Sequence, residues 1–371
     1  MKKILFVTNI PSPYSADLFY YLQSSIKKYK FYVLYTHETE DNRKWTIDKE
    51  KLKNTIILKS RILKVKTKLD IRYIHIPGKV FNTISRVNPD MVIAWEYNIA
   101  AVQSMIWCKR HNKKFISVTE GTLLTESNLW LIQKITRKMI ISTANAFLVS
   151  GIKAKEKLLS WGVKKEKIFT ELLTVDVNNF VGGHREVKKN IILYVGSLVK
   201  RKGVDLLISS LPLIENNYVL RIVGNGTEDE ISTLKKIADS LNVSDKIEWC
   251  GFKEGKDLVK EYKEAAVFVL PTREDCFGLV LLEALASGVP IVASKYADGA
   301  YDIVLPGKNG LMVDPYKKEE LAEAIDFVLG NPKIWPEWEQ YSAEIVKKFS
   351  YPEVSKGIID AIEFGLKKTE R

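Results

Sequence analysis

Two acidic residues and a glycine in one apolar stretch have the types and spacing to bind a phosphorylated ligand. Residues 272–294 read TREDCFGLVLLEALASGVPIVAS, with Asp275 ahead of an apolar helical run and Glu283 inside it. The first turn of a helix leaves backbone N–H groups free that favour negative charge, and Gly278 has no side chain to keep a phosphate from them. From Gly278 to Glu283 a helix rises roughly 7 to 8 Å. The stretch could therefore hold a diphosphate on its amides, a ribose on Glu283 and the attached group at Asp275.

A purely structural role for the same residues stays open. Asp275 could cap the helix, and Glu283 could be an internal salt-bridge partner. The helix expected over 279–286 carries Glu283 as its one charge and is apolar enough to be buried. Because a buried carboxylate is costly without a hydrogen-bond partner, something must meet Glu283, and a ligand is one candidate.

A second turn in the chain has the composition of an anion site. The apolar run 191–195 reads as a strand and is followed by Gly196, the cations Lys200, Arg201 and Lys202, and then Gly203 before a helix. Cations at the entrance of a helix favour a diphosphate. One such turn is a weak signal, but it gains weight beside the matching strand and helix at 267–288.

The elements that must position these turns alternate in type along the chain. Short apolar runs separated by amphipathic stretches predict strands joined by helices in parallel sheets. The strands expected in the first half are 3–7, 31–35, 91–94, 115–118 and 146–149, and those in the second half are 191–195, 220–223, 247–251, 267–271 and 291–293. A helix over 321–329 and an amphipathic helix over 351–366 follow.

Composition is that of an ordinary globular protein with an uneven charge. The 371 residues predict two domains, and three widely spaced cysteines, Cys108, Cys250 and Cys276, favour a reducing cytosol and no metal site. Residues 1–180 carry a balance of +16 and residues 181–371 one of −4, which together give the net charge of +12. The first half therefore favours an anionic partner such as an acidic membrane surface, a phosphorylated acceptor or nucleic acid. The basic segment 49–68 could be a flap against lipid head groups or a phosphorylated carrier, or it could be a charged edge strand.

The motif from Asp275 through Glu283 to Glu-Ala-Leu-Ala-Ser-Gly-Val-Pro resembles the signature of retaining family 4 glycosyltransferases with the GT-B fold. The resemblance implies two Rossmann-like, doubly wound α/β domains facing a central cleft. It places an acceptor-binding domain at 1–182, with the helix at 351–371 packing back on it, and a nucleotide-sugar domain at 183–350. The hinge would lie at 181–184, and residues 306–313 resemble the edge hairpin of the family.

The resemblance also implies roles for individual residues. Asp275, or Glu274 beside it, would contact the donor sugar; Glu283 would bind the ribose; and Lys202 would pair with the phosphates. Ser197 stands where the family has an arginine, so Arg201 or Lys200 is expected to supply that charge, and Glu120 to serve the acceptor. The remaining donor contacts are expected at Gly224, Phe252, Lys253, Cys276, Phe277, Gly278 and Leu279.

The implied reaction is retaining, metal-independent transfer of a hexosyl group from a UDP- or GDP-sugar, with no cofactor. The acceptor would be a glycan or lipid-linked saccharide, in cytoplasmic synthesis of cell-surface polysaccharide or glycoconjugate at the inner face of the membrane. A sugar-nucleotide epimerase or phosphorylase of the same fold is the first alternative. A nucleic-acid-binding protein is the second, although the sequence lacks the matching basic and aromatic motifs, so nucleic acid is not expected as a partner.

Overall fold

The computed structural model describes residues 1–371 except 42, 44, 171–172, 182–184, 188–189 and 368–371. Within the described residues the chain divides into two compact units. Unit 1 comprises residues 1–67, 71–174 and 351–371, and unit 2 comprises residues 68–70 and 175–350. The boundary predicted at 182/183 and most of the expected hinge lie outside the described residues.

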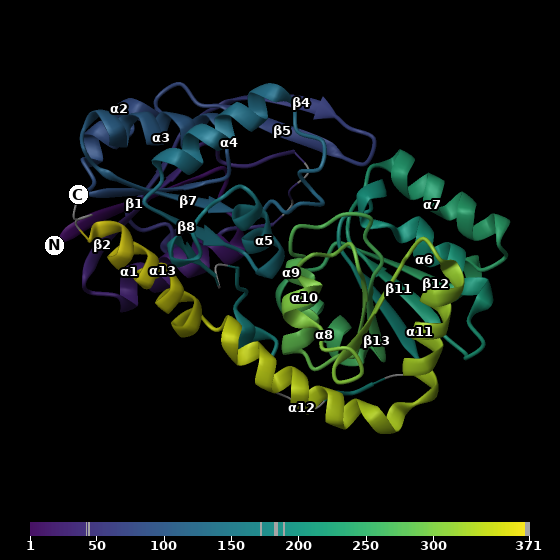
Figure 1. Ribbon diagram of the computed structural model, residues 1–371. Helices are drawn as coiled ribbons and strands as arrows, with labels where there is room; N and C mark the ends of the chain where they lie inside the picture. Colours follow the sequence, from purple (N-terminus) through teal and green to yellow (C-terminus); the bar gives the residue numbers. More distant parts are fainter. Residues whose placement is uncertain (42, 44, 171–172, 182–184, 188–189, 368–371) are drawn as a thin grey trace. The chain divides into compact units, whose positions relative to one another are not determined.

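Unit 1 is built on a parallel seven-stranded sheet with the order β3-β2-β1-β6-β7-β8-β9 (Figure 1). These strands are β1 (Lys2–Thr8), β2 (Tyr29–Tyr35), β3 (Thr55–Ile57), β6 (Met91–Trp95), β7 (Lys114–Thr119), β8 (Ala146–Val149) and β9 (Ile168–Phe169). A separate antiparallel pair, β4 (Arg61–Lys66) and β5 (Ile71–Ile76), follows the edge strand β3.

Alternate side chains of the unit 1 strands fill two hydrophobic cores because the sheet is covered on both faces. Ile4 and Phe6 pack with α1 (Pro13–Ser25) and α13 (Tyr351–Leu366), whereas Leu5 and Val7 pack on the opposite face. The helices contributing to that second core are α2 (Val80–Val87), α3 (Ile99–Arg110), α4 (Leu131–Thr143) and α5 (Ile152–Ser160).

Unit 2 is a parallel six-stranded sheet with the order β12-β11-β10-β13-β14-β15. Its strands are β10 (Ile191–Val195), β11 (Val219–Val223), β12 (Ile247–Gly251), β13 (Val267–Leu270), β14 (Ile291–Ser294) and β15 (Gly310–Val313). Its helices are α6 (Val204–Ser210), α7 (Glu228–Ser240), α8 (Gly255–Glu264), α9 (Leu279–Ala286), α10 (Ala300–Ile303), α11 (Lys318–Gly330) and α12 (Trp335–Val346). Both units are doubly wound α/β domains, as the alternating sequence pattern predicts.

The edge hairpin predicted over 306–313 is wrong. Strand β15 pairs in parallel with β14 along its whole length and forms the last strand of the sheet. Gly307, at φ +76°, supports a tight turn that resembles a hairpin in sequence, but the chain then enters the sheet in the common direction. Gly310 is required at the start of β15, since a Cβ there would lie 2.3 Å from the Ile291 carbonyl oxygen.

Candidate donor site in unit 2

The loops after β10 and β13 are packed against each other, and this contact builds the site. The Arg201 carbonyl accepts hydrogen bonds from the Arg273 amide (2.8 Å) and from the Thr272 hydroxyl (3.0 Å). Arg273 in turn binds Asp205 with both guanidinium nitrogens at 2.7 Å. The two predicted anion turns therefore form one structure, because β10 and β13 are neighbours in the sheet and their carboxyl ends share an edge.

Gly203 permits this close packing. It has φ +74°, and a Cβ there would lie 2.0 Å from the Pro271 carbonyl oxygen.

We expect Gly203→Ala to destabilise the protein by about 2–4 kcal/mol, since the backbone must move and a left-handed conformation is strained with a side chain. Urea unfolding measures this. Gly255→Ala is the matched control: Gly255 has φ +57° but nothing within 4 Å, so its cost should be only about 1 kcal/mol. Equal losses for both variants would show that the loop contact is unimportant.

Lys202 and Asp275 meet at the centre of these loops. The Lys202 Nζ donates to Asp275 Oδ2, and the two side chains are 15% and 12% exposed. Burial alone would raise the pKa of Asp275, but the charges of Lys202 and Arg201 and hydrogen bonds from Lys202 and the Phe277 amide lower it below the ordinary value. Asp275 is therefore a carboxylate at neutral pH. Its side chain is itself the anion that pairs with Lys202 at this position.

Arg201 and Glu274 lie beside this pair. The Arg201 guanidinium donates to Asp70 Oδ2 at 2.9 Å and to the Glu274 carbonyl at 3.0 Å, and both bonds lie within unit 2. Its charge still reaches Asp275, whose pKa it lowers. Lys200, the other cation considered in place of the missing arginine, is exposed. Ser197 lies two residues after β10, and its carbonyl accepts a hydrogen bond from the Tyr194 hydroxyl at 2.7 Å.

Gly278 immediately precedes α9, at φ +80°, three residues after Asp275. A Cβ on Gly278 would lie 3.7 Å from Asp275 Oδ2, so the start of α9 adjoins the carboxylate that Lys202 binds. Helix α9 starts at Leu279 with Gly278 as its N-cap, and the capping role considered for Asp275 is therefore wrong. Phe277 is buried at 2% exposure, and Cys276 is half-buried and is not part of a disulfide.

Glu283 lies inside α9 with a neutral partner that the sequence did not predict. The Tyr262 hydroxyl of α8 donates to Glu283 Oε2 at 2.8 Å. Burial raises the pKa of Glu283 to about 7, although the hydrogen bond from Tyr262 opposes the rise. The partner is a phenol and not the cation that a salt bridge would require. No spacing signal links residues 21 positions apart on two helices, so only the fold reveals Tyr262.

Tyr262→Phe gives a test of this contact. Without the hydroxyl the charged form of Glu283 loses its donor, so the pKa of Glu283 should rise further and stability should fall by about 1 kcal/mol. The pH at which nucleoside diphosphate affinity reaches half its maximum should move upward. An unchanged pH profile would mean that Glu283 does not govern binding.

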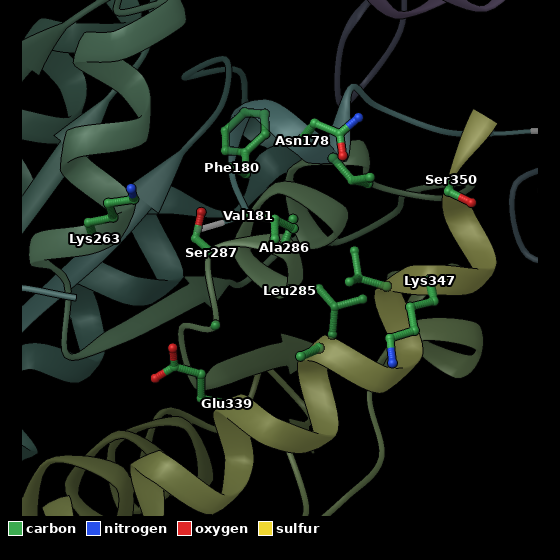
Figure 2. Close-up of a pocket in the computed structure, with 14 residues that line it drawn as sticks. Asn178, Phe180, Val181, Lys263, Leu285, Ala286, Ser287, Glu339, Lys347 and Ser350 are labelled. Atoms are coloured by element: carbon green, nitrogen blue, oxygen red, sulfur yellow. The ribbon is translucent and has the colours of Figure 1, made fainter. Parts of the chain in front are cut away.

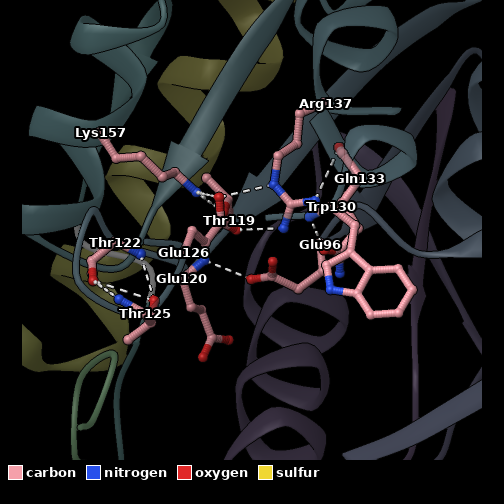
Figure 3. Close-up of polar contacts among 10 residues, drawn as sticks. All are labelled: Glu96, Thr119, Glu120, Thr122, Thr125, Glu126, Trp130, Gln133, Arg137 and Lys157. Carbon is pink, nitrogen blue, oxygen red and sulfur yellow. Dashed lines mark hydrogen bonds and ion pairs between the residues drawn. The ribbon is translucent and has the colours of Figure 1, made fainter. Parts of the chain in front are cut away.

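The other predicted donor contacts follow neighbouring strands. The Gly196 amide donates to the Val223 carbonyl and the Gly224 amide to the Gly251 carbonyl, so the loops after β10, β11 and β12 lie in sequence along one sheet edge. Phe252 is 41% exposed at this edge, and Lys253 is paired with Glu261. Glu120 lies in unit 1, where its amide donates to Glu96 Oε1 at 2.7 Å (Figure 3). All the nominated functional roles stay predictions.

A separate cavity of about 380 Å³ in unit 2 contains none of the predicted site residues. Figure 2 shows it at the other end of α9, where Leu285, Ala286 and Ser287 line it together with Lys347 of the segment after α12. An eight-residue helix is about 12 Å long. This cavity is therefore distinct from the Lys202–Asp275 pair at the start of α9.

Residues 178–345, all in unit 2, match the family described as Glycosyl transferases group 1. Among curated relatives, an uncharacterized glycosyltransferase of Methanocaldococcus jannaschii is 30% identical over 188 residues, which is 49% of this chain and 47% of the relative. Mannosylfructose-phosphate synthase of Agrobacterium fabrum is 32% identical over 35% of this chain and 31% of its own length. The chain spans less than half the length of the first curated relatives it matches.

Similarity to solved structures extends over both units. A lipopolysaccharide outer core galactosyltransferase, WaaB, matches with a TM-score of 0.75 and 19% identity over 97% of this chain and 99% of that one. HepE of Anabaena, solved in complex with UDP, matches with a TM-score of 0.79 and 16% identity over 97% of this chain and 99% of that one. Identities this low establish the fold alone. Residues 178–345 are therefore similar to the glycosyl transferases group 1 family, and the whole chain has the GT-B fold.

Proposed function

We propose that this chain is a glycosyltransferase that binds a nucleoside diphosphate sugar in unit 2. The observation that carries the proposal is the juxtaposition of Lys202 and Asp275 beside Gly278 at the start of α9. Lys202 and the free amides of α9 supply fixed positive potential for a departing diphosphate. Glu283, about 7 to 8 Å further along the helix, is placed to accept ribose hydroxyls. The matched family and the UDP complex of a structural relative support this assignment.

The finer features belong to the same proposal. The chain would be a retaining hexosyltransferase of family 4, with Asp275 or Glu274 contacting the sugar and Arg201 standing in for the arginine absent at Ser197. The acceptor would be a glycan or lipid-linked saccharide used in cell-surface polysaccharide synthesis, with Glu120 on the acceptor side. The charge of unit 1 favours an anionic acceptor or an anionic membrane nearby.

Metal independence is part of the proposal. Among the described residues there is no group of three or more His, Cys, Asp or Glu side chains arranged to hold a metal ion. The charge of the diphosphate would instead meet Lys202 and Arg201. Turnover that does not change when EDTA is added would support metal independence. Turnover that EDTA abolishes and Mg²⁺ restores would contradict it.

Thermal stabilisation by UDP, GDP and ADP tests the donor site and identifies the base together. One of the three should raise the unfolding temperature, since a ligand that binds only the folded state stabilises it. Transfer of labelled sugar from the matching nucleotide sugar to an added saccharide then distinguishes a transferase from an epimerase or phosphorylase. No stabilisation by any of the three would contradict the proposal.

Asp275→Asn separates phosphate binding from sugar orientation. Because Asp275 neutralises Lys202, its loss should free the cation for the diphosphate, and nucleotide affinity should stay level or rise. Turnover should fall by about 100-fold if Asp275 positions the sugar. Isothermal titration and sugar transfer measure the two effects. A parallel fall in both would show that Asp275 only maintains the loops.

A further inference from the structure

Helix α4 in unit 1 exposes an apolar surface that its sequence neighbours do not cover. Ile140 is its one buried residue, while Trp130, Leu131 and Ile132 at its start are 77%, 75% and 65% exposed. Ile135 and Met139 are each 44% exposed. Single exposed apolar residues are ordinary, but five within ten positions mark an interaction surface. We call these five residues the α4 face.

The orientation of α4 is fixed by contacts on its opposite side. Arg137 binds Glu126 through two nitrogens, at 2.8 Å and 2.7 Å, and both side chains are largely buried. Glu126 also pairs with the buried Lys157 at 3.4 Å (Figure 3). At about 100° per residue, Arg137 and Ile140 lie on the side of the helix opposite Leu131 and Ile135. Leu131, Ile132, Ile135 and Met139 therefore point outward because the polar network holds the helix in one rotation, and Trp130 lies just before them as the N-cap of the helix.

The charge around the α4 face selects one class of partner. Residues 131–143 contain Lys134, Arg137 and Lys138 and no acidic residue. Arg137 is engaged with Glu126, but Lys134 and Lys138 are exposed at the edge of the apolar side. An apolar strip with a tryptophan at its end and lysines along its edge is the composition of helices that lie in a lipid head-group layer.

Helix length agrees with lying on a membrane. Thirteen residues of helix extend about 20 Å, less than the roughly 30 Å of a hydrocarbon core. Among the described residues, no helix is both long and apolar enough to cross a membrane. We propose that the α4 face binds an anionic lipid surface, with Trp130, Leu131 and Ile132 entering the head-group layer and Lys134 and Lys138 contacting lipid phosphates.

Vesicle co-sedimentation of the full chain tests the proposal independently of the donor reaction. Wild type should bind equimolar phosphatidylcholine and phosphatidylglycerol vesicles more tightly than pure phosphatidylcholine vesicles, with the difference reduced by added salt. Trp130→Ser with Leu131→Ser should weaken binding by about tenfold or more. Lys134→Gln with Lys138→Gln should remove the preference for the anionic vesicles. All variants should keep the wild-type unfolding temperature because the changed side chains are exposed.

Leu213→Ser with Leu305→Ser is the matched control. These leucines of unit 2 are 40% and 44% exposed, so the pair removes exposed apolar surface elsewhere, and binding should not change. Brominated lipid gives a second readout: Trp130→Phe should bind nearly as wild type does but lose much of the tryptophan quenching. The proposal is overturned if wild type binds neither vesicle, if Trp130→Ser with Leu131→Ser binds normally, or if that variant instead abolishes a dimer that does not bind lipid.

Discussion

Lys202→Ala is expected to weaken nucleoside diphosphate binding by about 10- to 100-fold, the range for losing a hydrogen bond between a charged pair. Turnover should fall as well, since negative charge grows on the diphosphate as the sugar departs. Lys202 now pairs with Asp275, so a bound diphosphate would share or take over this cation. Isothermal titration with the nucleotide selected by thermal stabilisation measures the effect.

Lys200→Ala is the control for this variant. Lys200 belongs to the same short 3₁₀ turn, Lys200–Lys202, but its side chain is exposed. Removing it changes the charge of the loop equally and should alter affinity by less than about threefold, because an exposed charge is screened by solvent. If the two variants lose affinity to the same extent, the loop acts through its general charge, and the specific role of Lys202 is excluded.

Glu283→Gln is expected to weaken donor binding and to stabilise the protein at the same time. Burial raises the pKa of Glu283 from 4.5 to about 7, so the folded state holds this proton more tightly than the unfolded state. Stability contributed by the protonated form is therefore lost as pH rises between these values. At pH 8 glutamine removes the cost of a buried charge, and the variant should be more stable by about 1–3 kcal/mol. Below pH 5 the difference should disappear.

Donor affinity should show the opposite effect. A carboxylate accepts two ribose hydroxyls better than a neutral amide, so Glu283→Gln should bind about 10-fold more weakly at pH 8. Wild-type affinity should rise with pH through about 7, whereas the variant should follow only the titration of the ligand itself. Glu323→Gln, on an exposed part of α11, controls for the loss of one negative charge. A destabilised variant with wild-type affinity would make Glu283 a structural residue.

The sequence predicted the strands well because each is a short apolar run between turn residues. β8, β10 and β12 begin and end at the predicted residues, and so does α9, whereas β13 ends one residue before the predicted Pro271. Helix α12 was missed because two tryptophans and Pro336 obscure its pattern, although Trp338 packs in the core. The 49–68 segment forms β3 at the sheet edge and the first strand of the β4–β5 pair, and its contact with lipid stays a prediction.

The donor-site residues were predicted one by one, but their contacts were not. Lys202 and Asp275 are 73 positions apart, and only the adjacency of β10 and β13 brings them together. Tyr262 reaches Glu283 from another helix with no signal in the spacing. The α4 face did have a signal, since Trp130-Leu131-Ile132 precedes a helix without acidic residues. Contact with lipid was instead predicted for the more basic segment 49–68.

A crystal structure with the stabilising nucleoside diphosphate tests the donor site most directly. The account predicts a phosphate oxygen within about 3.2 Å of Lys202 Nζ, a second phosphate contact at the first amides of α9, and ribose hydroxyls on Glu283. A diphosphate bound away from Gly278, with Lys202 still held by Asp275 and Glu283 contacting only Tyr262, would contradict it.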